Sequence, residues 1–217
     1  MTHPVTGPHP PVSLPVRSLW PAAVPDPAEP SAPSGSDLAR AELAAGEFLR
    51  ALGMDLNAEH LQATPARMAR AWAEMLTPPP FDLTTFPNEE GYDELVVVRD
   101  VPVRSICEHH LLPFTGVATV GYLPGDRIVG LSKLARVVEY FAGRPQTQER
   151  LTQQVADWLQ RQLSPRAVGV VVSAEHSCMT LRGARAVGTS TVTSALLGRL
   201  RDDPRSRHEF LSLAGIA

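Results

Sequence analysis

Two amphipathic segments follow one another in residues 132–163, which read SKLARVVEYFAGRPQTQERLTQQVADWLQRQL. Ser132 is the predicted N-cap of a first helix that runs to about Ala142, and a second helix follows Thr147. Apolar residues recur at helical spacing in both, at Leu134, Val137, Val138 and Phe141 and then at Leu151, Val155, Trp158, Leu159 and Leu163. Each helix therefore presents one apolar face that another layer has to cover.

Strand-like sequence lies on both sides of this helical pair. Valine-rich or extended stretches precede it at 95–106, 115–123 and 127–131, and others follow it at 167–174, 179–182 and 190–196. Strands, then two adjacent helices, then strands again predict an α+β fold.

A second helical pair is predicted in the N-terminal part of the chain. Residues 38–52 carry an apolar helical face that ends before Gly53, the predicted C-cap. Thr64 is the predicted N-cap of the next helix, and Pro65 is its first residue. Near the C-terminus, Ser206 and Glu209 have the spacing of a capping box for a last short helix.

The first 36 residues differ in composition from the rest. They hold 10 of the 21 prolines, few charges and no periodic apolar face, which is typical of a disordered arm. The net charge of -3 lacks the basic excess of a nucleic-acid binder. No apolar run approaches the roughly 20 residues of a membrane span, and two cysteines do not make a disulfide scaffold.

The densest chemical cluster is Cys107-Glu108-His109-His110. Cys107 and His110 have a C-x-x-H spacing, and Cys178 lies beside another histidine, His176. Two thiolates and an imidazole favour zinc, and three ligands with a fourth position left to water are typical of a catalytic zinc site. An alternative interpretation without a metal is that the two cysteines are buried in the core and the histidines are packed and hydrogen-bonded.

A second group of residues is suited to anions. Ser132, Lys133 and Arg136 stand at a predicted helix start, where free N–H groups and the helix dipole favour phosphate. Lys133 is the single lysine among the 20 basic residues. Further candidate cations are Arg67, Arg70 and Arg182. Gln148-Glu149 is a pair that can bind the N–H-rich edge of guanine, although a glutamate is also ordinary in the first turn of a helix.

Several strings together resemble the GTP cyclohydrolase I family. They are TPARMAR (64–70), CEHHLLPF (107–114), GLSKLARVVEYFA (130–142), RPQTQERLT (144–152), EHSCMTLRG (175–183), STVTSALLG (190–198) and RHEFL (207–211). The resemblance covers residues 37–217 in one unbroken order and leaves the proline-rich arm, 1–36, outside. Gly143 departs from it, since the family usually has Arg or Gln there.

The resemblance implies a T-fold (tunnelling fold): an antiparallel sheet with two helices on one face, preceded by N-terminal helices. It divides the chain into a helical part, 37–92, and a catalytic part, 93–217. Sheets of five subunits would close into a barrel, two rings would stack into a homodecamer, and the active site would lie between subunits. The implied enzyme is cytoplasmic and uses one zinc ion per subunit.

The implied reaction turns GTP and water into 7,8-dihydroneopterin triphosphate and formate, the first step of tetrahydrofolate and pterin biosynthesis. Carried over residue by residue, the zinc ligands are Cys107, His110 and Cys178. The catalytic residues are His109, His176 and Ser132. The substrate-binding residues are Gln148 and Glu149 for guanine and Lys133, Arg136, Arg182, Arg67 and Arg70 around the ribose and triphosphate, with Arg67 lent by a neighbouring subunit.

Two other classes of protein stay open at this point. A related T-fold enzyme, a nitrile reductase acting on a deazaguanine, would use a cysteine nucleophile and nicotinamide, which the Cys107, His110 and Cys178 trio disfavours. A non-catalytic ring-forming protein would instead hold zinc in a closed site, with His109 or His176 as the fourth ligand.

Overall fold

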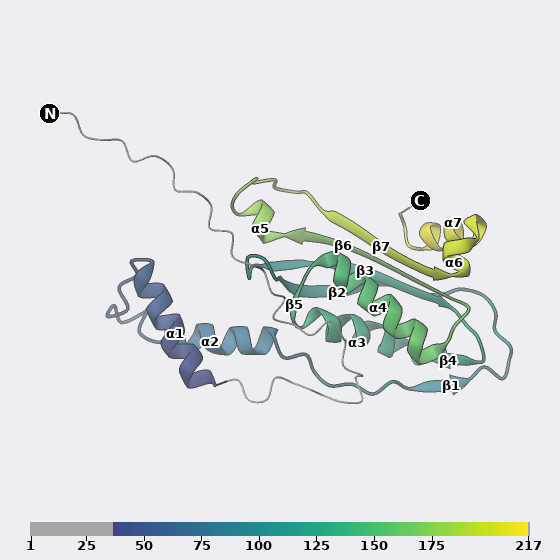
Figure 1. The fold of residues 1–217 in the computed structure, drawn as a ribbon, viewed down its shortest axis with the longest axis horizontal. Coiled ribbons are helices and arrows are strands. Elements are labelled where there is room, and N and C mark those ends of the chain that lie inside the picture. Colours follow the sequence, from purple (N-terminus) through teal and green to yellow (C-terminus); the bar gives the residue numbers. More distant parts are fainter. Residues whose placement is uncertain (1–36, 217) are drawn as a thin grey trace, which may run out of the picture.

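A five-stranded sheet forms the centre of the computed structural model, which describes residues 37–216 (Figure 1). The strands stand in the order β5 (Pro145–Gln146), β2 (Val96–Cys107), β3 (Pro113–Leu123), β6 (Ala167–His176) and β7 (Thr191–Gly198). The ladders β2–β3, β3–β6 and β6–β7 are antiparallel, whereas β5 adds two residues parallel to β2. The predicted α+β class is confirmed, and the sheet is mixed at one edge rather than wholly antiparallel.

Two helices cover one face of this sheet (Figure 1): α3 (Leu131–Ala142) and α4 (Gln148–Leu163). Alternate residues of β6, such as Val168, Val170 and Val172, point to this side and join one buried cluster with Leu134, Leu151 and Trp158. The apolar residues expected on the two helices are the ones buried, so hydrophobic burial explains why the helices lie here.

The opposite face of the sheet is covered at one end by α6 (Arg199–Asp202) and α7 (Pro204–Leu213). Phe210 of α7 is fully buried with Leu123 of β3 and with Ala167 and Val171, which alternate along β6 with the first set. Gly169 makes room for it, because a Cβ there would lie 2.7 Å from the Phe210 ring.

Replacing Phe210 with alanine is expected to lower the free energy of unfolding by about 3–5 kcal/mol, since it leaves a cavity between α7 and the sheet. Urea denaturation followed by far-ultraviolet circular dichroism measures the change. Leu213→Ala is the matched control, because Leu213 lies on the same helix and is 45% exposed. A loss no larger than that of the control would contradict the packing role.

The N-terminal helices are α1 (Leu38–Ala51) and α2 (Thr64–Met75), which pack together beyond one end of the sheet (Figure 1). Gly53 follows the end of α1 and has a φ of 84°. Helices commonly end at a residue in this left-handed region, which glycine adopts easily. A separate two-stranded sheet joins β1 (Thr85–Pro87) to β4 (Arg127–Val129). The stretch predicted as a third strand thus stays outside the main sheet.

Three predicted helix caps are wrong by a few residues. Gly130 precedes α3, so Ser132 lies inside the helix, and Thr64 is the first residue of α2 rather than its cap. At α7 the cap is Asp203, whose carboxylate accepts from the backbone N–H groups of Arg205 and Ser206. An aspartate directly before Pro204 is the stronger start pattern, because proline favours the first helical position.

Gly143 permits a close approach of two segments. A Cβ at this position would lie 2.8 Å from Cβ and 3.0 Å from Cα of Pro78, in the segment that follows α2. A larger residue would push this segment away from the end of α3.

Within residues 37–216, no helix has both the length and the apolar character needed to cross a bilayer. The predicted arm, 1–36, lies outside the described residues.

Candidate metal centre and nucleotide site

The register of three antiparallel strands brings the metal-ligand candidates to one end of the sheet. Ile106 pairs with Pro113 across the β2–β3 hairpin, so Cys107 begins its connecting turn. Phe114 pairs with His176 across β3–β6, so the chain that leaves β6 arrives beside the same turn. Cys178 lies two residues beyond, on the short helix α5 (Ser177–Thr180).

The region of α5 was predicted as a strand over 179–182, and this prediction is wrong. Leu181 N–H donates to the Ser177 carbonyl at 3.0 Å, closing a helical turn, and the Ser177 hydroxyl donates to the Pro113 carbonyl. The helical turn directs Cys178 towards Cys107. In an extended chain, successive side chains would point to opposite faces instead.

Cys107, His110 and Cys178 form the cluster expected of a metal site. One ligand atom from each lies within 4.8 Å of the other two. Cys107 is buried, Cys178 is half-buried and His110 is exposed, so one side of the cluster is open to solvent. Cys107 Sγ lies 3.9 Å from Nδ1 of His110 and also 3.9 Å from Nδ1 of His109.

The Cys107 thiol affects the neighbouring Cys178 thiol. Burial, followed by the neighbouring Cys107, raises the pKa of the Cys178 thiol above its ordinary value, and Arg182 opposes the shift. A cation between the sulfurs has the opposite effect, because thiolate is the form that binds a metal. The donor set of two sulfurs and one imidazole nitrogen fits zinc.

Glu108 and Arg150 hold the ligand turn, and sequence reasoning missed both. The Arg150 guanidinium pairs with the Glu108 carboxylate and donates to Gln146 Oε1 at 2.8 Å and to the Pro145 carbonyl at 2.9 Å. Glu108 N–H donates to the Gln146 carbonyl at 3.0 Å. The turn between the ligands is therefore tied to β5 and to the first turn of α4.

His176, the last residue of β6, is held on two sides. Its ring stacks on Phe114, with centroids 4.5 Å apart and planes 9° from parallel, and its Nε2 lies 2.8 Å from Gln148 Oε1. Burial lowers the pKa of His176 below the ordinary imidazole value, and the Glu149 carboxylate opposes this shift. The ring therefore stays neutral more readily than a histidine in water.

The guanine pair splits into a buried and an exposed residue. Gln148 is 1% exposed, whereas Glu149, the next residue in the first turn of α4, is exposed. Both lie near His176, so the structure brings these three predicted site residues together. Of the pair Gln148 and Glu149, only Glu149 offers its side chain to solvent.

The predicted anion-binding residues lie in three parts of the chain: α3, the loop after α5, and α2. Ser132, Lys133 and Arg136 are in the first turns of α3, where Lys133 is half-buried and the other two are exposed. Arg182 follows α5 and is close enough to Cys178 to affect its pKa.

The two predicted arginines of α2 make no hydrogen bond to the other predicted site residues within the described part of the chain. Arg67 donates to the His60 carbonyl at 3.1 Å and to Thr64 Oγ1 at 3.0 Å, and Arg70 is exposed. The contribution of both arginines to a nucleotide site stays a prediction, which for Arg67 involves the site of a neighbouring subunit.

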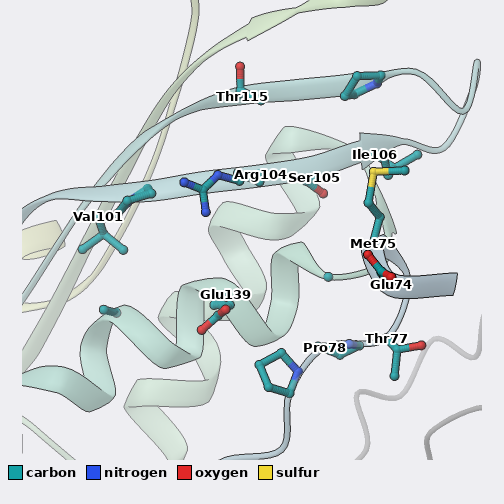
Figure 2. Close-up of a pocket in the computed structure, with 15 residues that line it drawn as sticks. Glu74, Met75, Thr77, Pro78, Val101, Arg104, Ser105, Ile106, Thr115 and Glu139 are labelled. Carbon is teal, nitrogen blue, oxygen red and sulfur yellow. The ribbon is translucent and has the colours of Figure 1, made fainter. Parts of the chain in front are cut away.

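A cavity of about 540 Å³ lies elsewhere, along β2 (Figure 2). Arg104 and Ser105 of β2 line it on one side and Glu139 of α3 on the other, and Met75 closes one end. None of the predicted site residues lines it, so the volume of this cavity does not mark the chemical centre.

Known proteins give a consistent match. The family model described as GTP cyclohydrolase I matches residues 41–215. The chain is 51% identical to GTP cyclohydrolase 1 of Thermobifida fusca over 187 residues, 84% of this chain and 90% of that protein. It is 53% identical to the Mycolicibacterium vanbaalenii protein of the same name, over 82% of this chain and 90% of the relative.

A third relative, GTP cyclohydrolase 1 of Aquifex aeolicus, is 49% identical over 76% of this chain and 90% of its own length. Among solved structures, an archaeosine synthase QueF-Like in the apo form gives a TM-score of 0.40 at 18% identity, covering 48% of this chain and 93% of that one. A likeness of this size supports no conclusion.

Proposed function

Because the chain belongs to the GTP cyclohydrolase I family and is a hydrolase of that kind, we propose that it opens the purine ring of GTP at C8 in a zinc-dependent reaction. With one water, the products are formate and 7,8-dihydroneopterin triphosphate, which would begin tetrahydrofolate or pterin synthesis. The observation that carries the proposal is the convergence of Cys107, His110 and Cys178 beside His176.

Cys107, His110 and Cys178 are the residues that would hold zinc. Their three donors leave a position for a water, and the exposed His110 side of the cluster supports an open rather than a closed site. A bound zinc ion supplies a Lewis acid and a water whose pKa is about 7. His176 is not part of the group of donors that lie within 4.8 Å of one another in the described part of the chain, which disfavours it as a fourth ligand of a structural site.

Two histidines have the placement for proton transfer. His176 would take up a proton from solvent and pass it to N7 of the guanine ring, which makes C8 electrophilic. His109 stands beside the Cys107 ligand and is exposed, so it would move protons at the attacking water or the ribose. Ser132, at the start of α3, would assist at the ribose.

The remaining residues would position the substrate. The exposed Glu149 would accept hydrogen bonds from the N–H edge of guanine, which favours guanine over adenine. Lys133, Arg136, Arg182 and Arg70, joined by Arg67 of a neighbouring subunit, would hold the triphosphate. Binding these distant groups places C8 at the metal and lowers the entropy cost of reaction.

Lys133→Ala is expected to raise KM for GTP about tenfold or more while kcat changes less. A hydrogen bond to a charged group is worth about 1.5–3 kcal/mol, and about 1.36 kcal/mol is a factor of ten. Initial rates over a range of GTP concentrations measure both constants. Arg161→Ala, in the exposed last turn of α4, is the matched control and should leave KM unchanged.

Open sheet edges support a ring of subunits. On its outer side β2 pairs only at Ile106 and Cys107, and in residues 37–216 β7 pairs only with β6. Unpaired strand edges bind other strands readily, so we propose that β7 of one copy pairs with β2 of the next. The cavity of Figure 2 lies along that edge and would face the neighbour.

Ten copies in two rings would follow from the family resemblance. Sedimentation velocity tests this, since a species at the mass of one 23.4 kDa chain would contradict the ring.

Incubation of the zinc-loaded protein with GTP tests the whole proposal. Formate and the dihydropterin absorbance are expected to rise together, and a chelator should stop both until zinc is restored. Zinc bound without turnover would favour a structural site in a non-catalytic protein. Turnover that survives complete zinc removal would contradict the metal assignment. A cytoplasmic location is part of the proposal and is tested by cell fractionation.

A further inference from the structure

Gln148 is a polar side chain that is almost completely buried, at 1% exposed, between α4 and the sheet. Buried amides are stable only when their donors and acceptors are paired. Its Nε2 lies 3.0 Å from the Val172 carbonyl, 2.8 Å from the Thr191 carbonyl and 3.2 Å from Thr193 Oγ1. Two N–H groups thus face three acceptors, and no donor is left for a ligand.

These contacts determine which way the amide points. Val172 and Thr191 offer carbonyl oxygens, which can only accept, so the nitrogen of Gln148 has to lie on their side. Oε1 then faces His176 Nε2 at 2.8 Å. Because a carbonyl oxygen cannot donate, the hydrogen of this bond must be on Nε2 of His176.

The neutral ring of His176 is therefore the Nε2–H tautomer, with the lone pair on Nδ1. The hydrogen bond to Gln148 fixes the position of Nε2. The stack on Phe114 keeps the imidazole ring parallel to the phenyl ring. Nδ1 has no hydrogen-bond partner among residues 37–216, so it is the atom left to exchange a proton with a bound molecule.

The backbone of Gln148 is held as well. Thr152 Oγ1 lies 2.8 Å from the Gln148 carbonyl and 2.7 Å from Thr193 Oγ1, so a hydrogen-bonded network joins α4, β6 and β7. This network ties the orientation of the amide to three elements of the core rather than to a mobile side chain.

We propose that Gln148 is a positioning residue, which selects the tautomer and orientation of His176 instead of contacting guanine, so that recognition of the base falls to Glu149. This inference rests on the proposed function for the role of His176 in turnover. It differs from the expectation drawn from the sequence, where Gln148 and Glu149 were a guanine-binding pair. The acceptor that would read the N–H edge of guanine is Oε1, and Oε1 is engaged by His176 in a side chain that is only 1% exposed.

The tautomer in the wild-type protein is the first test. Zinc-loaded protein labelled with ¹⁵N-histidine is studied by magic-angle-spinning NMR at a pH where histidine is neutral, and the His176 resonances are assigned by their loss in His176→Ala. The Nε2–H tautomer alone is expected. The Nδ1–H tautomer would overturn the proposal without any variant of Gln148.

Gln148→Met is the second test, because methionine has a similar length and cannot accept the hydrogen bond. The variant is expected to give mixed His176 tautomers and a kcat lowered about 10- to 100-fold, as for residues that orient catalytic ligands, with KM changed less than about threefold. Gln153→Met is the matched control, on the exposed side of α4, and should change neither tautomer nor kcat.

A raised KM with an unchanged kcat in Gln148→Met would overturn the proposal in favour of base recognition. If the variant does not fold, the wild-type tautomer still decides. A wild-type protein that shows the expected tautomer but does not convert GTP would sink the proposed function and leave the positioning of His176 established.

Discussion

Cys178→Ala is expected to lose the bound zinc and turnover together. The substitution leaves two of three ligands and removes the sulfur that α5 directs towards Cys107. A metal in such a reaction contributes several kcal/mol of transition-state stabilisation, so formate production should fall on the order of 10³-fold or more. Mass spectrometry of metals after dialysis, alongside the formate assay, measures both quantities.

Met179→Ala provides the matched control for this variant. Met179 is the next residue of the same short helix, is 39% exposed and is not one of the three proposed ligands. It should bind one zinc per chain. If Cys178→Ala binds zinc as tightly as Met179→Ala, the metal lies elsewhere and the ligand assignment fails.

His176→Ala has the second large effect, and it separates chemistry from metal binding. The ring bonds to Gln148 and stacks on Phe114, so its loss should leave the zinc content unchanged. Loss of a general acid lowers kcat about 10²- to 10⁴-fold. Ring opening should be the step that is lost, as seen by chromatography of the GTP incubated with the variant.

His208→Ala is the control, since His208 is an exposed histidine on α7. Zinc loss in His176→Ala would mean that His176 is a ligand, as in a closed structural site. Full activity with zinc retained would remove His176 from the mechanism.

Local sequence patterns determined the elements that build the core. The apolar spacing in 132–163 predicts α3 and α4, and the valine-rich stretches predict β2, β3 and β6, because burial of a regular apolar face is decided within one element. A short segment has too few residues to show a regular apolar face, so its secondary structure is harder to predict from the sequence. Residues 179–182 alternate too briefly to separate a strand from the helical turn that forms there.

The metal trio was also predictable, since few side chains bind zinc and the spacing of Cys107 and His110 is restrictive. The residues that support the site were not. The Glu108–Arg150 ion pair joins positions far apart in the chain, and each residue alone looks like a solvated charge.

Gln148 illustrates the limit most clearly. In the sequence it is a polar residue beside Glu149 at a helix start, where both side chains are equally suited to a ligand. Its burial and its partners come from β6 and β7, which the chain reaches only after α4 has ended. Residue type and local spacing therefore determined which chemistry this protein carries. The packing of distant strands decided which groups face a ligand and which hold others in place, because hydrogen bonds and burial depend on neighbours in space.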